Sequence, residues 1–263
     1  MAGFELKQND TGTSARLGVL TTVHGEVQTP VFMSVGTSGT VKGIFVEQLK
    51  RAGCEMILAN TYHLMSRPGV EAVEKIGGLH RFMAWDGPIL TDSGGYQIFS
   101  LNSLTKIDDD GVEFSSHIDG QKFYLTPELA TQIQVRLGAD VIMCLDECTP
   151  FPCEPDKLQK AVDRTIRWAR QCKDAHHKQD QMLFGIVQGG IDPALREYCA
   201  AEMVAMDFDG YALGGLSVGE GHENMMRIVE HTSPLLPMPS ALTIRSAMWM
   251  MPAFIGFSAE EGL

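Results

Sequence analysis

The feature that most constrains the fold is a repeated alternation of short apolar runs with amphipathic segments. Six apolar runs each end in polar or glycine residues: VFMSVG (31–36), MILAN (56–60), PILTDSGG (88–95), VIMCLDE (141–147), MLFGIVQGG (182–190) and YALGGLSVG (211–219). The helical patterns among them are VEQLKRAG (46–53), VEAVEKIGGLH (70–80), PELATQIQVRLG (127–138), PDKLQKAVDRTIRWARQ (155–171), DPALREYCAAEM (192–203) and ENMMRIVEH (223–231). Near-continuous apolar strands that alternate with helices predict a parallel sheet covered by helices.

A doubly wound sheet and a (β/α)8 TIM barrel both satisfy this α/β pattern. Polar and glycine residues mark the carboxyl ends of successive predicted strands: Asn60, Asp92, Asp146, Gln188 and Gly215. Such ends converge on one mouth in a barrel, whereas they spread along an edge in an open sheet. We therefore favour the barrel, with about six of its eight strand–helix units present in the sequence.

Two β-hairpins stand outside the repeated units. The first runs over residues 17–30 with its turn at His24–Gly25, and the second is inserted at residues 105–126 around a DDDG turn. The helix after the inserted hairpin begins with Thr126 as N-cap and Pro127 in its first turn. Its residues Leu129, Ile133 and Leu137 are predicted to form one buried stripe.

Composition excludes several classes of protein. No secretory signal opens the chain, and no stretch reaches the ~20 apolar residues of a membrane-spanning helix. The six cysteines form no C-x-x-C pair, which favours reduced thiols and a cytoplasmic location, and no metal-binding motif is present.

The net charge of −12 argues against a nucleic-acid partner, because such proteins usually carry a basic patch. One predicted helix carries Arg164, Arg167, Arg170 and Lys173. This run is interpreted either as a contact surface for RNA or as an ordinary solvated helix face.

The most informative motif is TDSGGYQ, residues 91–97. Asp92 lies at a strand end beside two glycines that let a ligand approach the backbone, which suits a general acid/base next to a planar substrate. The alternative is a tight turn in which Asp92 caps the next helix. Ser93 is not in a G-x-S-x-G context, which argues against a serine nucleophile.

The second motif is MCLDECTP, residues 143–150. A carboxylate at the end of an apolar strand is costly to bury without a partner, so Asp146 should meet a hydrogen-bond donor. The ring N–H and exocyclic amine of guanine are two such donors, and a salt bridge inside the barrel is the alternative. Two glycine-rich blocks, GIVQGG (185–190) and LGGLSVGE (213–220), suit either a phosphate or a purine carbonyl.

Read together, six blocks resemble the signature motifs of the tRNA-guanine transglycosylases (queuine tRNA-ribosyltransferases), in order and at the family's spacing. The blocks are TPVFMSVGT, NTYHL, TDSGGYQ, LDECTP, FGIVQGG and YALGGLSVGE, and the resemblance extends from about Leu17 to Pro237.

The resemblance implies exchange of guanine at the wobble position of a tRNA anticodon loop for a 7-deazaguanine base in queuosine biosynthesis. The family works by double displacement through a covalent intermediate. Asp92 matches the family's general acid/base, Asp146 the acceptor for the guanine edge, and Gln188 and the Gly215 N–H the donors to the guanine carbonyl. The same resemblance places further residues at the base: Ser93, Gly94, Gly95, Tyr96, Cys148, Leu216 and Val218.

Tyr96 is implied to stack on the purine. Cys148 and Val218 resemble the bacterial branch, which takes 7-aminomethyl-7-deazaguanine rather than queuine. Two partners of the intact family, a zinc ion and a second copy of the chain in a homodimer, are also implied.

The sequence departs from the family after residue 239. We expect residues 1–239 to form an incomplete TIM-barrel transglycosylase domain and residues 240–263 to form a tail that matches no family block. The family's nucleophilic Asp and its cysteine-rich zinc ligands are absent from this tail, so the chain as given is expected to be inactive. Two other interpretations stay open: a non-catalytic base- or partner-binding member of the family, and an unrelated barrel enzyme for a phosphorylated metabolite.

Overall fold

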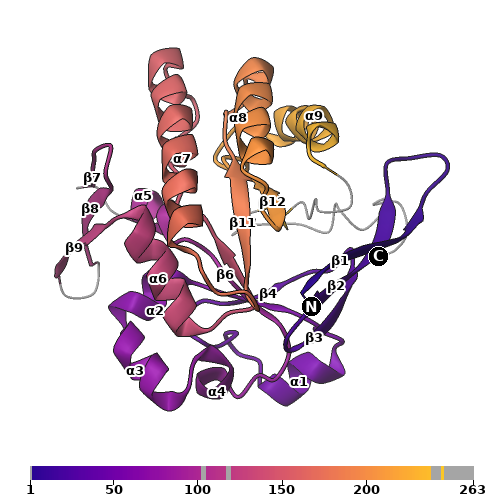
Figure 1. The fold of residues 1–263 in the computed structure, drawn as a ribbon, viewed down its shortest axis with the longest axis vertical. Helices are drawn as coiled ribbons and strands as arrows, with labels where there is room; N and C mark the ends of the chain where they lie inside the picture. The colour runs from indigo at the N-terminus through magenta and orange to yellow at the C-terminus, as the bar shows by residue number, and fades with distance from the viewer. Residues whose placement is uncertain (1, 102–104, 117–119, 238–243, 246–263) are drawn as a thin grey trace.

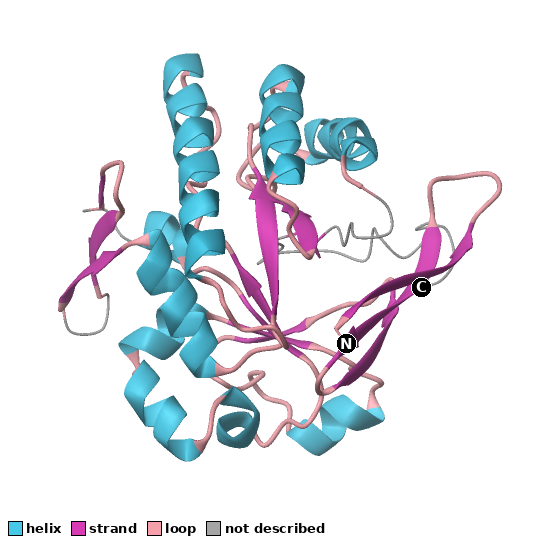
Figure 2. Cartoon of the chain, in the orientation of Figure 1, coloured by secondary structure: helices cyan, strands magenta, loops and turns pink. Residues whose placement is uncertain are grey.

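The computed structural model describes residues 2–101, 105–116, 120–237 and 244–245 (Figure 1). Its centre is a parallel sheet, whose strands are magenta in Figure 2. The sheet has seven strands in the order β13–β12–β11–β10–β6–β5–β4. The strands are β4 (Ser34–Gly36), β5 (Ile57–Ala59), β6 (Ile89–Thr91), β10 (Val141–Met143), β11 (Met182–Val187), β12 (Gly210–Leu213) and β13 (Ile244–Arg245). All six apolar runs thus contain a strand, and the predicted α/β class with a parallel sheet is confirmed.

The seventh strand, β13, was not predicted. It pairs in parallel with β12 through Ala212–Ile244 and Leu213–Arg245, inside the stretch that the sequence pattern assigns to a tail. A strand of two residues is too short to show a periodicity, and only its pairing with a neighbour identifies it. The other residues predicted to form the tail, 240–243 and 246–263, lie outside the described residues.

The helices follow the strands as the repeat predicts, with two short additions. They are α1 (Val46–Arg51), α2 (Thr61–Ser66), α3 (Val70–Ile76), α4 (Leu79–Met83), α5 (Gly95–Leu101), α6 (Pro127–Leu137), α7 (Pro155–Ala175), α8 (Pro193–Ala205) and α9 (His222–Thr232), followed by a short 3-10 helix, η1 (Ser233–Leu235). Helices α2 and α5 were not predicted. The pattern at 70–80 forms two helices rather than one, because Gly77 and Gly78 separate α3 from α4.

Helix α6 begins as predicted, since the Thr126 side chain accepts a hydrogen bond from Leu129 N at 3.2 Å. Its predicted buried stripe is partly wrong. Ile133 and Leu137 are buried, but Leu129 is 39% exposed and Ala130 takes its place in the core. A strict spacing of four drifts around a helix of 3.6 residues per turn, so the first residue of such a series leaves the buried face.

The two faces of the sheet pack against different partners. One face packs against the helices around residues such as Ile142, Trp168 and Leu183. The other face packs Val141, Met143 and Phe184 against Leu20 and Val27 of the amino-terminal hairpin. The alternation within β10 therefore covers both faces with apolar side chains, as expected for a sheet that is buried on both sides.

Each predicted hairpin belongs to a three-stranded antiparallel sheet, and the two small sheets flank the central sheet on opposite sides (Figure 1). Strand β1 (Gly3–Asn9), which was not predicted, joins β2 (Arg16–Thr22) and β3 (Gly25–Thr29). The inserted segment consists of β7 (Lys106–Ile107), β8 (Val112–Ser115) and β9 (Lys122–Leu125). Its predicted turn is present, and Asp108 Oδ1 accepts hydrogen bonds from Asp110 N and Gly111 N, each at 2.9 Å.

Candidate functional site

Five residues mark one edge of the parallel sheet. Asn60, Asp92 and Gln188 directly follow β5, β6 and β11, whereas Asp146 and Gly215 follow β10 and β12 after short extensions. Parallel neighbours end at the same edge of a sheet, and hydrogen bonds join several of these residues across the strands. Ligands bind at this carboxyl edge in both barrel and open α/β proteins.

Asp92 accepts hydrogen bonds from four donors, one of which is the side chain of Gln97. Its Oδ2 accepts from Asn60 Nδ2 at 2.7 Å, and its Oδ1 accepts from Thr61 N at 3.0 Å and from Gly94 N at 3.1 Å. The Asn60 amide cannot turn freely, because its oxygen caps α2 by accepting from His63 N at 3.2 Å. Asp92 thus contacts the start of a helix, as the capping alternative requires, but that helix is α2 rather than the one that follows it.

The surroundings of Asp92 favour proton transfer at neutral pH. Burial raises the pKa of Asp92 to about 7, against the hydrogen bonds that lower it and with a smaller contribution from the charge of Asp146. The residue nevertheless keeps partial exposure, so a ligand can reach it. An acid whose pKa lies near the working pH can both give and take a proton, which is the requirement for general acid–base catalysis.

Asp146 is buried and lies beside Asp92 in the same group of residues. Its Oδ2 accepts from Gln188 Nε2 at 2.6 Å, and its Oδ1 accepts weakly from Ser93 Oγ at 3.4 Å. Burial raises the pKa of Asp146 to about 6 despite these bonds. Asp146 has no cationic partner among the described residues, which removes the salt bridge that the sequence left open.

Two glycines bring backbone close to these side chains. A Cβ on Gly95 would lie 2.9 Å from Asp146 O and 3.3 Å from Asp146 Oδ1. A Cβ on Gly215 would overlap Gln188 Oε1. A side chain at Gly95 would therefore displace the backbone of Asp146, and one at Gly215 would displace the Gln188 amide, which explains why the motifs need glycine there.

The remaining predicted residues lie around this group. Tyr96 is half-buried on α5, and burial, with a smaller contribution from Cys148, raises its pKa. Burial, assisted by Asp146, raises the pKa of Cys148 to about 12, so this thiol stays protonated. Leu216 is buried and Val218 is half-buried.

A small cavity of about 50 Å³ reaches the same edge. Gly215, Val218 and Glu220 line it together with Gly190. Glu220 also accepts hydrogen bonds from Ser217 N and Val218 N, which fixes the loop that follows β12.

The basic run on α7 is not a free cationic surface. Arg164 pairs with Glu147 and Asp109, and Arg167 pairs with Asp109. Further along the helix, Arg170 pairs with Glu202, while Lys173 donates to the carbonyl oxygens of Met206 and Asp207. These basic side chains already have partners within the protein, so the structure favours the solvated-face interpretation over an RNA contact.

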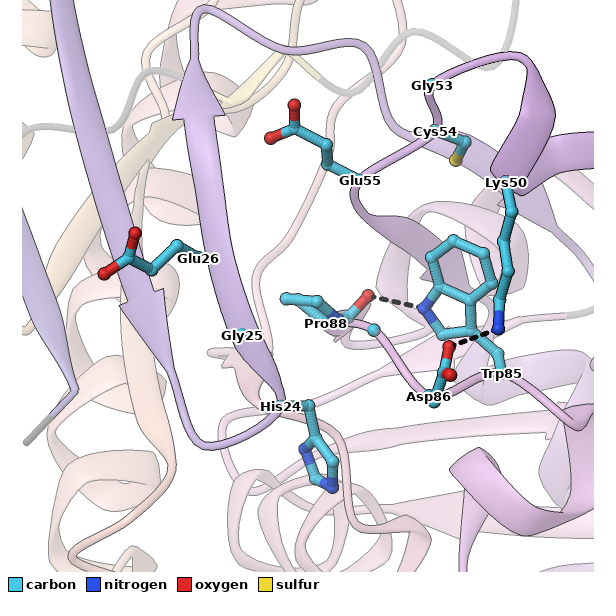
Figure 3. A pocket seen from close by; sticks show the side chains of 11 residues that line it. His24, Gly25, Glu26, Lys50, Gly53, Cys54, Glu55, Trp85, Asp86 and Pro88 are labelled. Carbon is cyan, nitrogen blue, oxygen red and sulfur yellow. Dashed lines mark hydrogen bonds and ion pairs between the residues drawn. The ribbon is translucent and has the colours of Figure 1, made fainter.

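A separate depression lies at the opposite, amino-terminal edge of the sheet. It encloses about 440 Å³ and is lined by His24, Glu26, Lys50, Glu55, Trp85 and Asp86, among others (Figure 3). Glu55 precedes β5 and Pro88 precedes β6, so the depression is remote from the carboxyl edge. We place the candidate site with the carboxylates, because they supply the chemistry.

The described residues hold one group with metal-ligand geometry: His24, His80 and Asp140. Asp140 already accepts from His24 Nδ1 at 2.8 Å, His80 Nε2 at 3.1 Å and Ile89 N at 2.9 Å. This group contains no cysteine and is internally hydrogen-bonded, so it does not fit the cysteine-rich zinc site that the resemblance implies.

Sequence reasoning placed Asn60 at a strand end but gave it no role, and it missed three further polar contributors to the site. Asn60 and Gln97 both bond to Asp92, Glu220 fixes the loop after β12, and Arg196 holds the loop after β11. Asn60 and Gln97 lie inside the quoted blocks NTYHL and TDSGGYQ, which could have indicated them. Arg196 stands in an ordinary helical pattern that gives no such signal.

The fold and the site define an α/β protein with a group of hydrogen-bonded carboxylate and amide side chains at the carboxyl edge of a parallel sheet. A sequence profile described as Queuine tRNA-ribosyltransferase matches residues 10–247. The chain belongs to this transferase family.

Relatives named Queuine tRNA-ribosyltransferase support the assignment. Those from Desulforamulus reducens and Halothermothrix orenii are 54% and 50% identical over 234 residues, which cover 89% of this chain and 63% of each relative. The one from Staphylococcus aureus is 52% identical over 226 residues, covering 86% of this chain and 60% of the relative. The chain therefore spans less than two thirds of the length of these relatives. No described helix has the length and apolarity needed to cross a membrane.

Proposed function

We propose that this protein takes part in tRNA-guanine transglycosylation, in which guanine at the wobble position of an anticodon loop is exchanged for 7-aminomethyl-7-deazaguanine. The observation that carries the proposal is the arrangement of Asp92, Asp146 and Gln188 at one sheet edge. Its two carboxylates have raised pKa values, and neither has a cationic partner among the described residues. A planar base with N–H donors and a carbonyl complements this set.

Each side chain has a separate task. Asp146 accepts from the ring N–H and the exocyclic amine of guanine, while Gln188 and the Gly215 N–H donate to the guanine carbonyl. Asp92 gives its proton to the departing guanine and takes one from the incoming base. Tyr96 covers the purine face, and Ser93, Gly94 and Gly95 shape the turn that carries Asp92.

The carboxylate that attacks the anomeric carbon in double displacement is not assigned to any described residue. The base has to leave its stack before it reaches the pocket, because the reacting atoms are buried within the RNA.

Several finer points belong to the same proposal and rest on the resemblance. The sheet is part of a (β/α)8 barrel, residues 1–239 form its domain, and the protein works in the cytoplasm. Cys148 and Val218 give the pocket its preference for the aminomethyl base over queuine, and Leu216 lies at the base. Zinc and a second copy of the chain are the further partners that the family implies, and no step above depends on either.

The base pocket is tested by guanine binding to the purified chain. Replacing Asp146 by Ala should weaken guanine binding by about 1–3 kcal/mol, because the amine-bearing edge of the base loses its acceptor. Hypoxanthine lacks the exocyclic amine, so the same substitution should weaken hypoxanthine binding less. Equilibrium dialysis with labelled bases measures both affinities.

Asp174→Ala, at an exposed acid on α7, is the matched control and should leave both affinities unchanged. Equal losses for guanine and hypoxanthine in Asp146→Ala would contradict the proposed pairing, and failure of the unaltered chain to bind guanine would remove the base pocket altogether. Guanine binding without exchange into tRNA would instead support a base-binding role.

A further inference from the structure

Arg196 is an arginine without an ion-pair partner in the interior of the described structure. It lies in the first turns of α8, and its side chain is fully buried. Its Nε donates to Gly190 O at 2.9 Å and its Nη1 donates to Val187 O at 2.8 Å. Its Nη2 is buried and has no hydrogen-bond partner among the described residues. A buried cation of this kind is costly unless nearby groups compensate its charge.

The unpartnered Nη2 and the Gln188 amide oxygen lie close to the same glycine, within about 6 Å of each other. Both Gln188 Oε1 and Arg196 Nη2 border the same point at Gly215, where an added Cβ would overlap the amide oxygen and lie 3.6 Å from Nη2. At its other end, Gln188 Nε2 donates to Asp146 Oδ2 at 2.6 Å. The amide therefore has a carboxylate on its nitrogen side and a guanidinium on its oxygen side.

A primary amide has nearly the same shape at both ends, so packing alone does not decide which end faces which neighbour. The two charges do decide it in the free protein. When a base binds, the Asp146 carboxylate accepts from the base instead of from Gln188. Arg196 is then the charge that keeps the Gln188 amide oxygen directed away from the base.

We propose that Arg196 is a positioning residue that fixes the orientation of the Gln188 amide and so sets the preference for a 6-oxo over a 6-amino purine. This inference rests on the proposed base pocket. With its nitrogen towards the ligand, Gln188 donates to a carbonyl. In the reversed orientation it would accept from an amine, and the pocket would lose part of its discrimination.

The test compares guanine with 2,6-diaminopurine, which keeps the 2-amine but carries an amine in place of the 6-oxo group. In Arg196→Met, the ratio of guanine affinity to 2,6-diaminopurine affinity should fall about tenfold, the size of one hydrogen-bond contribution. Arg196→Lys keeps the charge but not the planar fork, so its ratio should stay within about threefold of the unaltered chain. Equilibrium dialysis gives the ratios, and thermal unfolding followed by circular dichroism checks the fold.

Three further variants complete the test. Arg227→Met on α9, which removes an exposed arginine, should leave the ratio unchanged. In a Gln188→Ala background, Arg196→Met should no longer alter the ratio, because the amide that Arg196 orients is gone. Arg196→Gln also removes the charge but keeps a polar side chain. It replaces Arg196→Met in the comparison of affinities if the Met variant does not fold.

Four outcomes would overturn the inference. These are an unchanged ratio in the neutral variants, an equal fall in the Lys and Met variants, an effect of Arg196→Met that persists without Gln188, and an unaltered chain that does not bind guanine. The last outcome removes the proposed function itself. The first three leave guanine binding intact and refute only the role of Arg196.

Discussion

Replacing Asp92 by Asn is expected to lower base exchange by about 10²- to 10⁴-fold, the usual contribution of a general acid–base group. Asn has nearly the shape of Asp and keeps an oxygen that can accept from Thr61 N and Gly94 N, but it cannot transfer a proton. Guanine binding should change far less, because Asp146 and Gln188 make the proposed contacts to the base.

The pH dependence gives a second measure of the same assignment. Because the pKa of Asp92 is raised to about 7, its proton-carrying form prevails below this pH and falls about tenfold per unit above it. Departure of guanine from tRNA should therefore slow above pH 7 in the unaltered protein, and the small residual rate of Asp92→Asn should lack this decline.

The measurement follows labelled guanine into unmodified tRNA over time. The assay uses either this chain or a longer protein that contains it. The unaltered version of the protein used has to show incorporation of guanine. Asp174→Ala serves as the control for the loss of a negative charge. Turnover of Asp92→Asn close to that of the unaltered protein would refute the assignment of Asp92 as general acid/base.

The sequence predicts the class of the fold because each strand carries enough apolar residues to be identified on its own. All six runs contain strands, and the polar residues at their ends lie at one edge of the sheet. Strand β13 escapes prediction, since its two residues become a strand only through pairing with β12. Strand β1 is largely exposed, so burial leaves only a weak pattern in its sequence.

For the candidate site, the sequence predicts which residues lie together but not how they interact. That Asp92, Asp146 and Gln188 lie together follows from the parallel sheet and from motif position. Their hydrogen-bond partners and raised pKa values depend on burial by residues far apart in the sequence, which no local motif specifies. Arg196 illustrates this limit of sequence-based prediction. An arginine on a solvated helix face could have the same local sequence as this buried one.

The other large effect that we expect is on stability, from replacing Asp140 by Ala. Asp140 lies just before β10, its side chain is only 1% exposed, and it joins three parts of the fold. Its Oδ1 accepts from His24 in the hairpin turn, and its Oδ2 accepts from His80 on α4 and from Ile89 N at the start of β6. The two histidine rings stack on each other with their centroids 3.5 Å apart.

The alanine variant removes the acceptor of three donors: the exposed His24, the half-buried His80 and the buried N–H of Ile89. The loss should lower the free energy of unfolding by about 2–6 kcal/mol, because each of the two less exposed donors left unsatisfied costs about 1–3 kcal/mol. Asp140→Asn keeps an acceptor oxygen and should lose about 1–3 kcal/mol. Urea unfolding at pH 7 measures both values, with Asp180→Ala, at an exposed acid, as the control.

The sign of the pH dependence follows from the hydrogen bonds to the carboxylate. Burial alone would raise the pKa of Asp140, but the bonds from His80, Ile89 and His24 outweigh it and leave the pKa below its ordinary value. A carboxylate with a lowered pKa stabilises the folded state above its unfolded pKa of about 4, and this stabilisation is lost as the pH falls through the folded pKa. The stability gap between the unaltered chain and Asp140→Ala should therefore narrow in acid. A gap that is already below about 1 kcal/mol at pH 7 would show that the histidines and Ile89 N find other partners, and that Asp140 does not hold the hairpin turn to the sheet.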